Sequence, residues 1–162
     1  MNYIKEFSVT FVLILIVILI RTFIITPAII NGDSMEPSLN DGNLVFLKKY
    51  NKNYERFEII VHKYEENRLV KRIIGMPGEH IAFEDSKLYV DGVEIEDVVP
   101  YTPDFDLTRL GIEVIPDDHY FVMGDNRSFS KDSRTIGPIH KDNIIGRTSF
   151  RIYPFNKIGK ID

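Results

Sequence analysis

The sequence predicts a mostly β protein, with a folded antiparallel sheet or small barrel-like domain that follows one N-terminal transmembrane helix. Beyond residue 31, short runs of β-branched and aromatic residues alternate with Gly, Pro, Asn and Asp, a pattern typical of strands joined by turns. No long stretch in this part has the apolar period of a helix. The residues before it contain the one apolar stretch of the chain that has the length of a bilayer.

That apolar stretch runs from Phe7 to Ile30 and is interrupted by Arg21 and Pro27. Its part up to Ile25 supplies the ~20 residues that a spanning helix needs, and Pro27 is a natural place for that helix to end. Arg21 then lies near one end, where its long side chain can reach the headgroups. A cleavable secretory signal is the alternative. An uncleaved anchor is favoured because the stretch is long, carries a charge and lacks a good Ala-x-Ala site after it.

We therefore expect two parts, a transmembrane signal anchor over residues 1–27 and an extracytoplasmic β-rich domain over residues 28–162. Lys5 precedes the anchor, whereas no Lys or Arg follows it until Lys48. Positive charges favour the cytoplasmic side of a membrane. This small asymmetry favours a single-pass plasma-membrane protein whose N-terminus is cytoplasmic.

Composition excludes several kinds of site. The chain has 162 residues and no cysteine, so disulfides, cysteine nucleophiles, thiolate zinc sites and iron–sulfur clusters are excluded. The formal net charge of −4 gives no footprint for nucleic acid. Four histidines are present, and no two have the spacing of a metal-binding pair on one element. We expect no metal and no cofactor.

Each predicted strand is a short β-type run bounded by turn residues. The Asp91-Gly92 pair predicts a tight hairpin between two of them. Residues 98–116 contain three prolines and are expected to form an extended surface loop. The other predicted strands are Leu44–Lys48, Glu58–Lys63, Arg68–Ile74, His80–Phe83, Lys87–Val90, Tyr120–Met123 and Ile144–Tyr153.

Ser34 is the first candidate for chemistry because it lies a few residues past the predicted anchor. A serine tethered at a bilayer surface can attack a substrate that itself arrives in the membrane. Gly32 leaves room for a close backbone approach, and Pro37 restricts the chain just after the serine. The alternative is an ordinary surface or capping serine, which is what an isolated serine most often is.

Lys71 is the candidate base. In strand geometry it shares a face with Leu69 and Ile73. Burial among aliphatic groups disfavours a charged amine and lowers its pKa from about 10.4. A neutral lysine can take the proton of a serine hydroxyl. The alternative is basic surface, and alternation leaves both open because Val70 and Ile74 make the opposite face apolar as well.

A dense polar loop over residues 124–134 follows the strand that ends at Met123. It holds two acids, two arginines and three serines within its last ten residues. One interpretation is a solvated turn. The other is a salt-bridged scaffold that presents a hydroxyl to orient another group. The Asn126-Arg127-Ser128 sequence also matches a glycosylation sequon.

A histidine base is a rival to Lys71. Asp117-Asp118-His119 could supply the partners of a Ser-His-Asp triad to Ser34. The Gly32-Asp33-Ser34 run also resembles the start of the GDSL esterases. That family needs helices between its strands, and such helices are not indicated here. His119 is better explained as a residue at the edge of a strand.

Taken together, these motifs resemble those of type I signal peptidase, the membrane-bound leader peptidase of bacteria. The resemblance extends from the apolar stretch to Pro138, and four separate motifs stand in the order of that family. The matching segments are Arg21 in the apolar stretch, Gly32–Leu39, Asp41–Val45, Lys71–Glu79, and Gly124–Arg127 continuing to Asp132–Arg134.

The resemblance implies a serine endopeptidase with Ser34 as nucleophile and Lys71 as general base. It implies that Ser130 holds the lysine amine in place, and that the backbone N–H of Ser34 stabilises the oxyanion. The implied fold is mostly β with an exposed apolar surface near the membrane, and the implied topology places the domain outside. Two supporting ion pairs are also implied: Asp125 with Arg72, and Asp132 with Arg134.

The implied substrates are secretory preproteins, cut after Ala-x-Ala-type sites, with membrane lipid and the protein-export machinery as further partners. One departure concerns Gly32, since larger family members have a serine there whose hydroxyl helps to stabilise the oxyanion. Two other classes stay open. A self-cleaving repressor shares this fold and dyad but lacks an anchor and carries a DNA-binding motif. An inactive binding protein would use the fold without cleaving.

Overall fold

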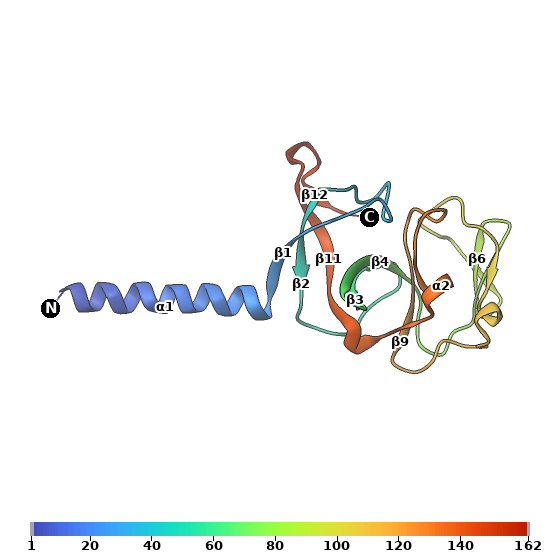
Figure 1. The fold of residues 1–162 in the computed structure, drawn as a ribbon, viewed down its shortest axis with the longest axis horizontal. Helices are drawn as coiled ribbons and strands as arrows, with labels where there is room; N and C mark the ends of the chain where they lie inside the picture. The colour runs from blue at the N-terminus through green and yellow to red at the C-terminus, as the bar shows by residue number, and fades with distance from the viewer. Residues whose placement is uncertain (1, 162) are drawn as a thin grey trace.

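A computed structural model describes the backbone of residues 2–161, together with their side chains except those of residues 2–5 and 20–23. Helix α1 (Asn2–Phe23) projects from a body built almost entirely of strands (Figure 1). The expected mostly β, antiparallel fold is therefore confirmed. The remaining helices are single turns: α2 (Ser133–Ile136), η1 (Leu107–Leu110), η2 (Lys141–Asn143) and η3 (Phe155–Lys157).

Helix α1 coincides with most of the predicted anchor, and its side chains from Phe7 to Leu19 are exposed. Measured by length and hydropathy over the described residues, no helix qualifies as a membrane span. The transmembrane helix is thus not confirmed and stays a prediction. The prediction for the Arg21 side chain falls outside the described side chains.

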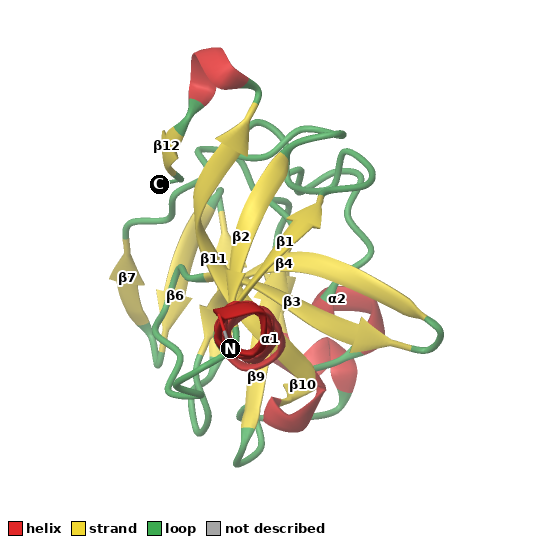
Figure 2. Cartoon of the chain, turned by 90° about the vertical axis from the view of Figure 1, so that its left-hand side faces the viewer, coloured by secondary structure: helices red, strands yellow, loops and turns green. Residues whose placement is uncertain are grey.

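The larger sheet has eight antiparallel strands and provides the frame of the site. Its strands follow the order β1-β2-β11-β3-β4-β9-β10, and β12 pairs with the end of β11. Viewed from the α1 end, these strands fan out around the helix axis (Figure 2). Their bounds are β1 Ile25–Ile29, β2 Leu44–Lys48, β3 Ile59–Tyr64, β4 Asn67–Gly75, β9 His119–Met123, β10 Ile139–His140, β11 Ile144–Tyr153 and β12 Gly159–Lys160.

The smaller sheet has the order β7-β6-β5-β8. Its strands are β5 (Ile81–Glu84), β6 (Lys87–Val90), β7 (Val93–Ile95) and β8 (Phe105–Asp106). The predicted Asp91-Gly92 hairpin joins β6 to β7, and both turn residues have the positive φ that such a turn requires. The expectation of a loop over residues 98–116 is wrong in part. Its apolar residues Phe105, Leu107 and Ile115 are buried in the core, and β8 and η1 form there.

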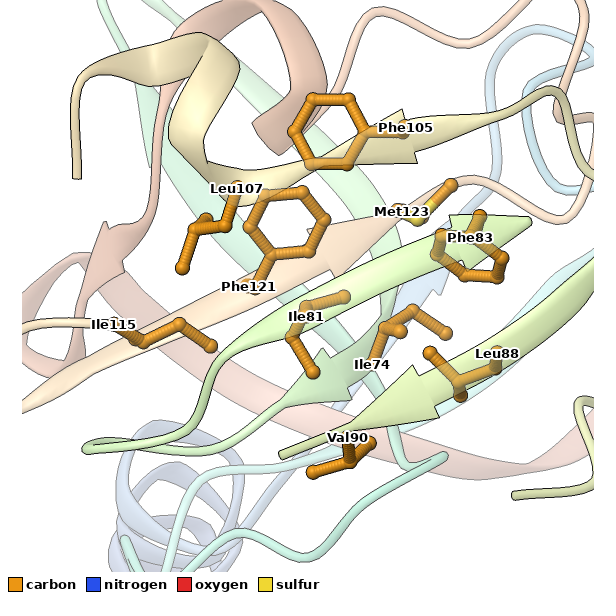
Figure 3. Packing of buried hydrophobic residues seen from close by; sticks show 10 residues of the cluster. All are labelled: Ile74, Ile81, Phe83, Leu88, Val90, Phe105, Leu107, Ile115, Phe121 and Met123. Atoms are coloured by element: carbon orange, nitrogen blue, oxygen red, sulfur yellow. The ribbon is translucent and has the colours of Figure 1, made fainter. Parts of the chain in front are cut away.

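Buried apolar residues form three clusters. The largest fills the space between the two sheets, with Phe121 and Met123 of β9 facing Phe83 and Leu88 (Figure 3). A second surrounds Ile60 and Ile73 on one face of the larger sheet. The third holds the loop that follows β1 against the opposite face, and consists of Ile30, Met35, Leu39, Val45 and Ile59.

Candidate active site

The loop that carries Ser34 is fixed by the residues around it. Met35 and Leu39 are buried in the third cluster, and the Leu39 N–H donates to the Met35 carbonyl at 2.9 Å. Gly32 has a φ of +88°, and its N–H donates to Asp41 Oδ1 at 2.7 Å. The chain is thereby anchored on both sides of Ser34, while Ser34 itself is only partly buried. Its hydroxyl is held in position yet stays within reach of a substrate.

Lys71 reaches this hydroxyl from β4. Its Nζ donates to Ser34 Oγ at 2.7 Å and to the Val70 carbonyl at 2.9 Å. Only 2% of Lys71 is exposed. Burial lowers the pKa of Lys71 from 10.5 to about 8, against the opposing charges of Asp132 and Asp125. The structure therefore brings the predicted nucleophile and base together, and the surface interpretation of Lys71 is wrong.

Arg72 and Asp125 form the first predicted ion pair. Arg72 Nε and Nη2 donate to the two carboxylate oxygens of Asp125 at 2.9 and 2.7 Å, and both side chains are almost fully buried. Further donor groups of Arg72 bind the Phe57 carbonyl and Ser38 Oγ. This bidentate pair ties β4 to the start of the polar loop and to the end of the Ser34 loop.

Asp132 and Arg134 form the second predicted pair, through two hydrogen bonds of 2.9 Å. Asp132 Oδ2 also accepts from the Gly124 N–H at 3.1 Å, so the carboxylate closes the polar loop on itself. Arg134 in turn donates to the Arg127 carbonyl at 2.7 Å. The loop is a salt-bridged scaffold, as the second interpretation of the sequence predicted.

Ser130 lies beside the dyad. A side chain at Gly124 would collide with both the Ser130 hydroxyl and the Ser34 carbonyl, so these two groups lie next to the same backbone position. Its Oγ is buried and has no hydrogen-bond partner in the structure. The hydrogen bond to the Lys71 amine that the resemblance implied is thus not formed here. The place of the residue agrees with the expectation, and its role stays a prediction.

Two contacts of the polar loop were not predicted from the sequence. The Asn126 N–H donates to the Ser34 carbonyl, and its side-chain amide to the Asp33 carbonyl, each at 3.1 Å. Arg127 forms a buried bidentate pair with Asp97, at 2.6 and 3.0 Å. Both contacts join segments far apart in the chain, so no local pattern signals them.

His119, the rival base, and its neighbour Asp118 contact residues other than Ser34. His119 Nδ1 bonds to the Asp117 carbonyl, and its ring packs on His140 at the β9–β10 edge. Asp118 pairs with Lys141. Within the described residues, no group of three or more His, Asp or Glu side chains could hold a metal ion.

Two hollows meet beside Ser34. One, of about 500 Å³, is lined by residues 31–34 and Glu36 on one side and by Lys71, Asn126, Phe129 and Lys131 on the other. The second, of about 490 Å³, lies between β1 and the Arg68–Val70 part of β4. They share Asn31, so they adjoin at the loop that carries Ser34, and we refer to the two together as the groove.

The β domain thus brings a serine hydroxyl within hydrogen-bond distance of a buried lysine amine, at the side of the groove. Sequence comparison identifies the family. Residues 3–153 match the model of the signal peptidase family, peptidase S26, and the chain belongs to that family. It is a hydrolase of the signal peptidase class, which implies exported preproteins as substrates.

Individual relatives agree with this assignment. The chain is 37% identical to signal peptidase I of Bacillus amyloliquefaciens, over 91% of this chain and 86% of that protein. It is 34% identical to signal peptidase IB of Staphylococcus aureus, over 97% and 91%. The crystal structure of a signal peptidase I from Enterococcus faecalis has a TM-score of 0.54 and 33% identity, and covers 59% of this chain and 96% of that one.

Proposed function

We propose that this protein is a membrane-anchored serine endopeptidase that removes signal peptides from exported preproteins by a dyad of Ser34 and Lys71. The observation that carries the proposal is the 2.7 Å contact between Lys71 Nζ and Ser34 Oγ, made by an amine that is 2% exposed. An amine whose pKa is lowered to about 8 by burial is neutral in a useful fraction of molecules near physiological pH. Charge-neutral lysine is what a serine hydroxyl needs as its base.

In the proposed reaction, Lys71 accepts the hydroxyl proton while Ser34 Oγ attacks the carbonyl carbon before the cut. The protonated lysine then gives that proton to the leaving amine, which leaves an ester between Ser34 and the signal peptide. Lys71 next takes a proton from water, whose oxygen attacks the ester and releases the carboxylate. Ser34 is regenerated when the lysine returns the proton.

The oxyanion of both steps needs hydrogen-bond donors. The Ser34 N–H has no acceptor among the described residues, so it is available for this role. The Gly32 N–H is already bound to the Asp41 carboxylate, and Gly32 has no hydroxyl. We therefore assign the oxyanion to the Ser34 N–H and assign no donor to Gly32.

The two ion pairs and Ser130 are proposed as positioning groups. The Arg72–Asp125 pair fixes β4 beside the Ser34 loop, and the Asp132–Arg134 pair fixes the segment that contains Ser130. Ser130 has a free buried hydroxyl next to the dyad. A small rotation of the Lys71 amine toward Ser130 after proton transfer would give the ammonium an additional acceptor.

The groove fits an extended peptide. Strand β1 pairs only with β2, and the Arg68–Val70 part of β4 pairs with β3 alone, because the β9 ladder begins at Arg72. Two strand edges therefore face the hollow between them and can hydrogen-bond an inserted strand. Four of its lining residues, Pro27, Ala28, Ile30 and Val70, are apolar, which suits the small side chains of an Ala-x-Ala site.

The anchor remains part of the proposal. Most described side chains of α1, including Phe11, Ile14 and Ile18, are exposed apolar groups. Burying such groups in the hydrocarbon of a bilayer is more favourable than leaving them in water. With α1 in the bilayer, the groove lies close to the membrane surface, on the extracytoplasmic side that the resemblance implies. Tethering raises the effective concentration of the site for a substrate held in the same bilayer, at the point where the export machinery delivers it.

The test uses the full chain in detergent with a preprotein that carries one Ala-x-Ala site, and reads the products by intact mass. We expect one cut after the second alanine by the wild type and none by Ser34→Ala. A Ser38→Ala variant is the control, because it removes a nearby hydroxyl that contacts Arg72 rather than the dyad. Equal cleavage by wild type and Ser34→Ala would refute the dyad. No cleavage by a folded wild type would favour an inactive binding protein.

A further inference from the structure

Phe129 is the most exposed large apolar side chain among the described residues, with 84% of its surface accessible. It stands at the tip of the polar loop and lines the same hollow as Ser34 and Lys71. Neither the dyad nor the ion pairs use it. An aromatic ring kept in water at the edge of a reaction site indicates a contact that forms only when a partner is bound.

The loop fixes the backbone that carries this ring. The Phe129 N–H donates to the Asn126 carbonyl at 3.1 Å, and Asn126 is bonded to the backbone of both Asp33 and Ser34. On the other side of the tip, Lys131 Nζ lies over the Tyr64 ring at 4.6 Å. Because both ends of the tip are fixed, the backbone of the tip loses little freedom when the ring meets a ligand.

The direction of the substrate follows from the order of the elements. Helix α1 leads into β1 (Figure 1), and the chain then continues through Asn31 to Ser34. A signal peptide that shares the bilayer with α1 enters the groove at the β1 end, so residues before the cut lie between β1 and β4. Residues after the cut pass Ser34 and reach the hollow that Phe129 lines.

We propose that Phe129 is a specificity-determining residue that contacts the first two residues of the mature chain, directly after the cut, and favours apolar or aromatic side chains there. This inference deepens the proposed function and depends on it. A ring-to-ring or ring-to-aliphatic contact of this kind corresponds to roughly a three- to tenfold preference in kcat/KM. Besides Phe129, Leu69 is the apolar side chain among the residues that line this hollow, whereas Asp33 and Glu36 are acidic.

The experiment compares peptides that share one Ala-x-Ala sequence and carry Phe-Phe, Leu-Leu or Gly-Gly directly after the cut. The kcat/KM of each is measured for the wild type, for Phe129→Ala and for the conservative Phe129→Tyr variant. Phe155→Ala is the matched control, because Phe155 is 76% exposed and lies on η3, outside the lining of the hollow. Because the Phe129 ring is exposed, its truncation in Phe129→Ala removes no core packing. Circular dichroism checks that the variant is folded.

We expect the wild type, Phe129→Tyr and Phe155→Ala to prefer Phe-Phe and Leu-Leu over Gly-Gly. Phe129→Ala should lose that preference, because its kcat/KM falls for Phe-Phe and Leu-Leu more than for Gly-Gly. A uniform change for all three peptides, or an unchanged preference, would overturn the assignment. Absence of cleavage by the wild type for every peptide would overturn the proposed function itself, which is a different result.

Discussion

Lys71 and Arg72 are consecutive residues of β4, and each is 2% exposed, yet the two buried cations have opposite surroundings. Arg72 donates to both carboxylate oxygens of Asp125 and to the Phe57 carbonyl. Lys71 donates to a carbonyl and to the neutral hydroxyl of Ser34, and no carboxylate lies within ion-pair distance of it in the described structure. Because side chains alternate along a strand, Arg72 lies on the face of its cross-strand partners Ile59 and Met123, and Lys71 lies on the other face.

The difference separates a structural cation from a chemical one. A buried charge that has a bidentate partner stays charged and holds segments together. A buried amine that lacks such a partner is driven toward its neutral form, and only that form can act as a base. The distant charges of Asp132 and Asp125 limit the fall of the Lys71 pKa without forming a direct bond.

Replacing Lys71 by Met should produce the largest effect and should separate activity from stability. Activity should fall by about 10⁴-fold, because serine then has no base. The free energy of unfolding should rise by about 3 kcal/mol at pH 7, since the pKa of Lys71 is lowered from 10.5 to about 8 and each unit corresponds to ~1.4 kcal/mol. Cleavage kinetics measure the loss of activity, and the midpoint of urea denaturation measures the change in stability. A less stable Lys71→Met protein would show that the amine is held by favourable bonds rather than strained by burial.

Replacing Arg72 by Met should have the opposite effect on stability and lower the free energy of unfolding. It leaves the Asp125 carboxylate buried without its partner, and such a loss costs about 3–5 kcal/mol. The double variant Arg72→Met/Asp125→Leu should recover most of that loss, because no charge is then left alone. Urea denaturation of the single and double variants measures the difference. If the double variant is as unstable as the single one, the packing of the guanidinium matters more than the ion pair.

How far the sequence predicts this structure depends on where the deciding contacts lie. Strands β2, β6 and β11 begin and end at the predicted residues, because each is a β-type run between clear turn signals. Strand β1 was not predicted, because Pro27 and its apolar neighbours read as the end of a helix. Pro27 is tolerated in β1 because the strand lies at the edge of the sheet.

The candidate site shows the same limit. Ser34 and Lys71 were predicted as candidates from their own short segments, and the two ion pairs were predicted only from the family resemblance. The burial of Lys71 could not be decided from alternation, since both faces of β4 are apolar and only the folded loops cover the lysine. The Arg127–Asp97 pair joins residues thirty positions apart, and Asp97 directly precedes the segment that was expected to form a surface loop. No periodicity carries such information.

The pH profile should follow the amine of Lys71 and not the guanidinium of Arg72. Below the pKa of about 8 the lysine of the folded protein is protonated and cannot act as a base. The kcat/KM should therefore fall about tenfold per pH unit on the acid side and level off above that pKa. Stability should change in the same direction, because the unfolded chain binds more protons between pH 8 and 10.5, so the free energy of unfolding rises over that window. A flat profile from pH 6 to 9 would contradict a lysine base.

The smallest effect should come from Asp132, which acts on Lys71 through its charge without touching the amine. Because the carboxylate raises the pKa of Lys71, an Asp132→Asn variant should move the acid limb of the kcat/KM profile to lower pH. Arg134 would also lose its partner, and its remaining positive charge works in the same direction. The midpoint of the limb reports this change even if the loosened loop lowers the rate at every pH. A midpoint that stays fixed, or that moves upward, would show that the carboxylate only shapes the loop.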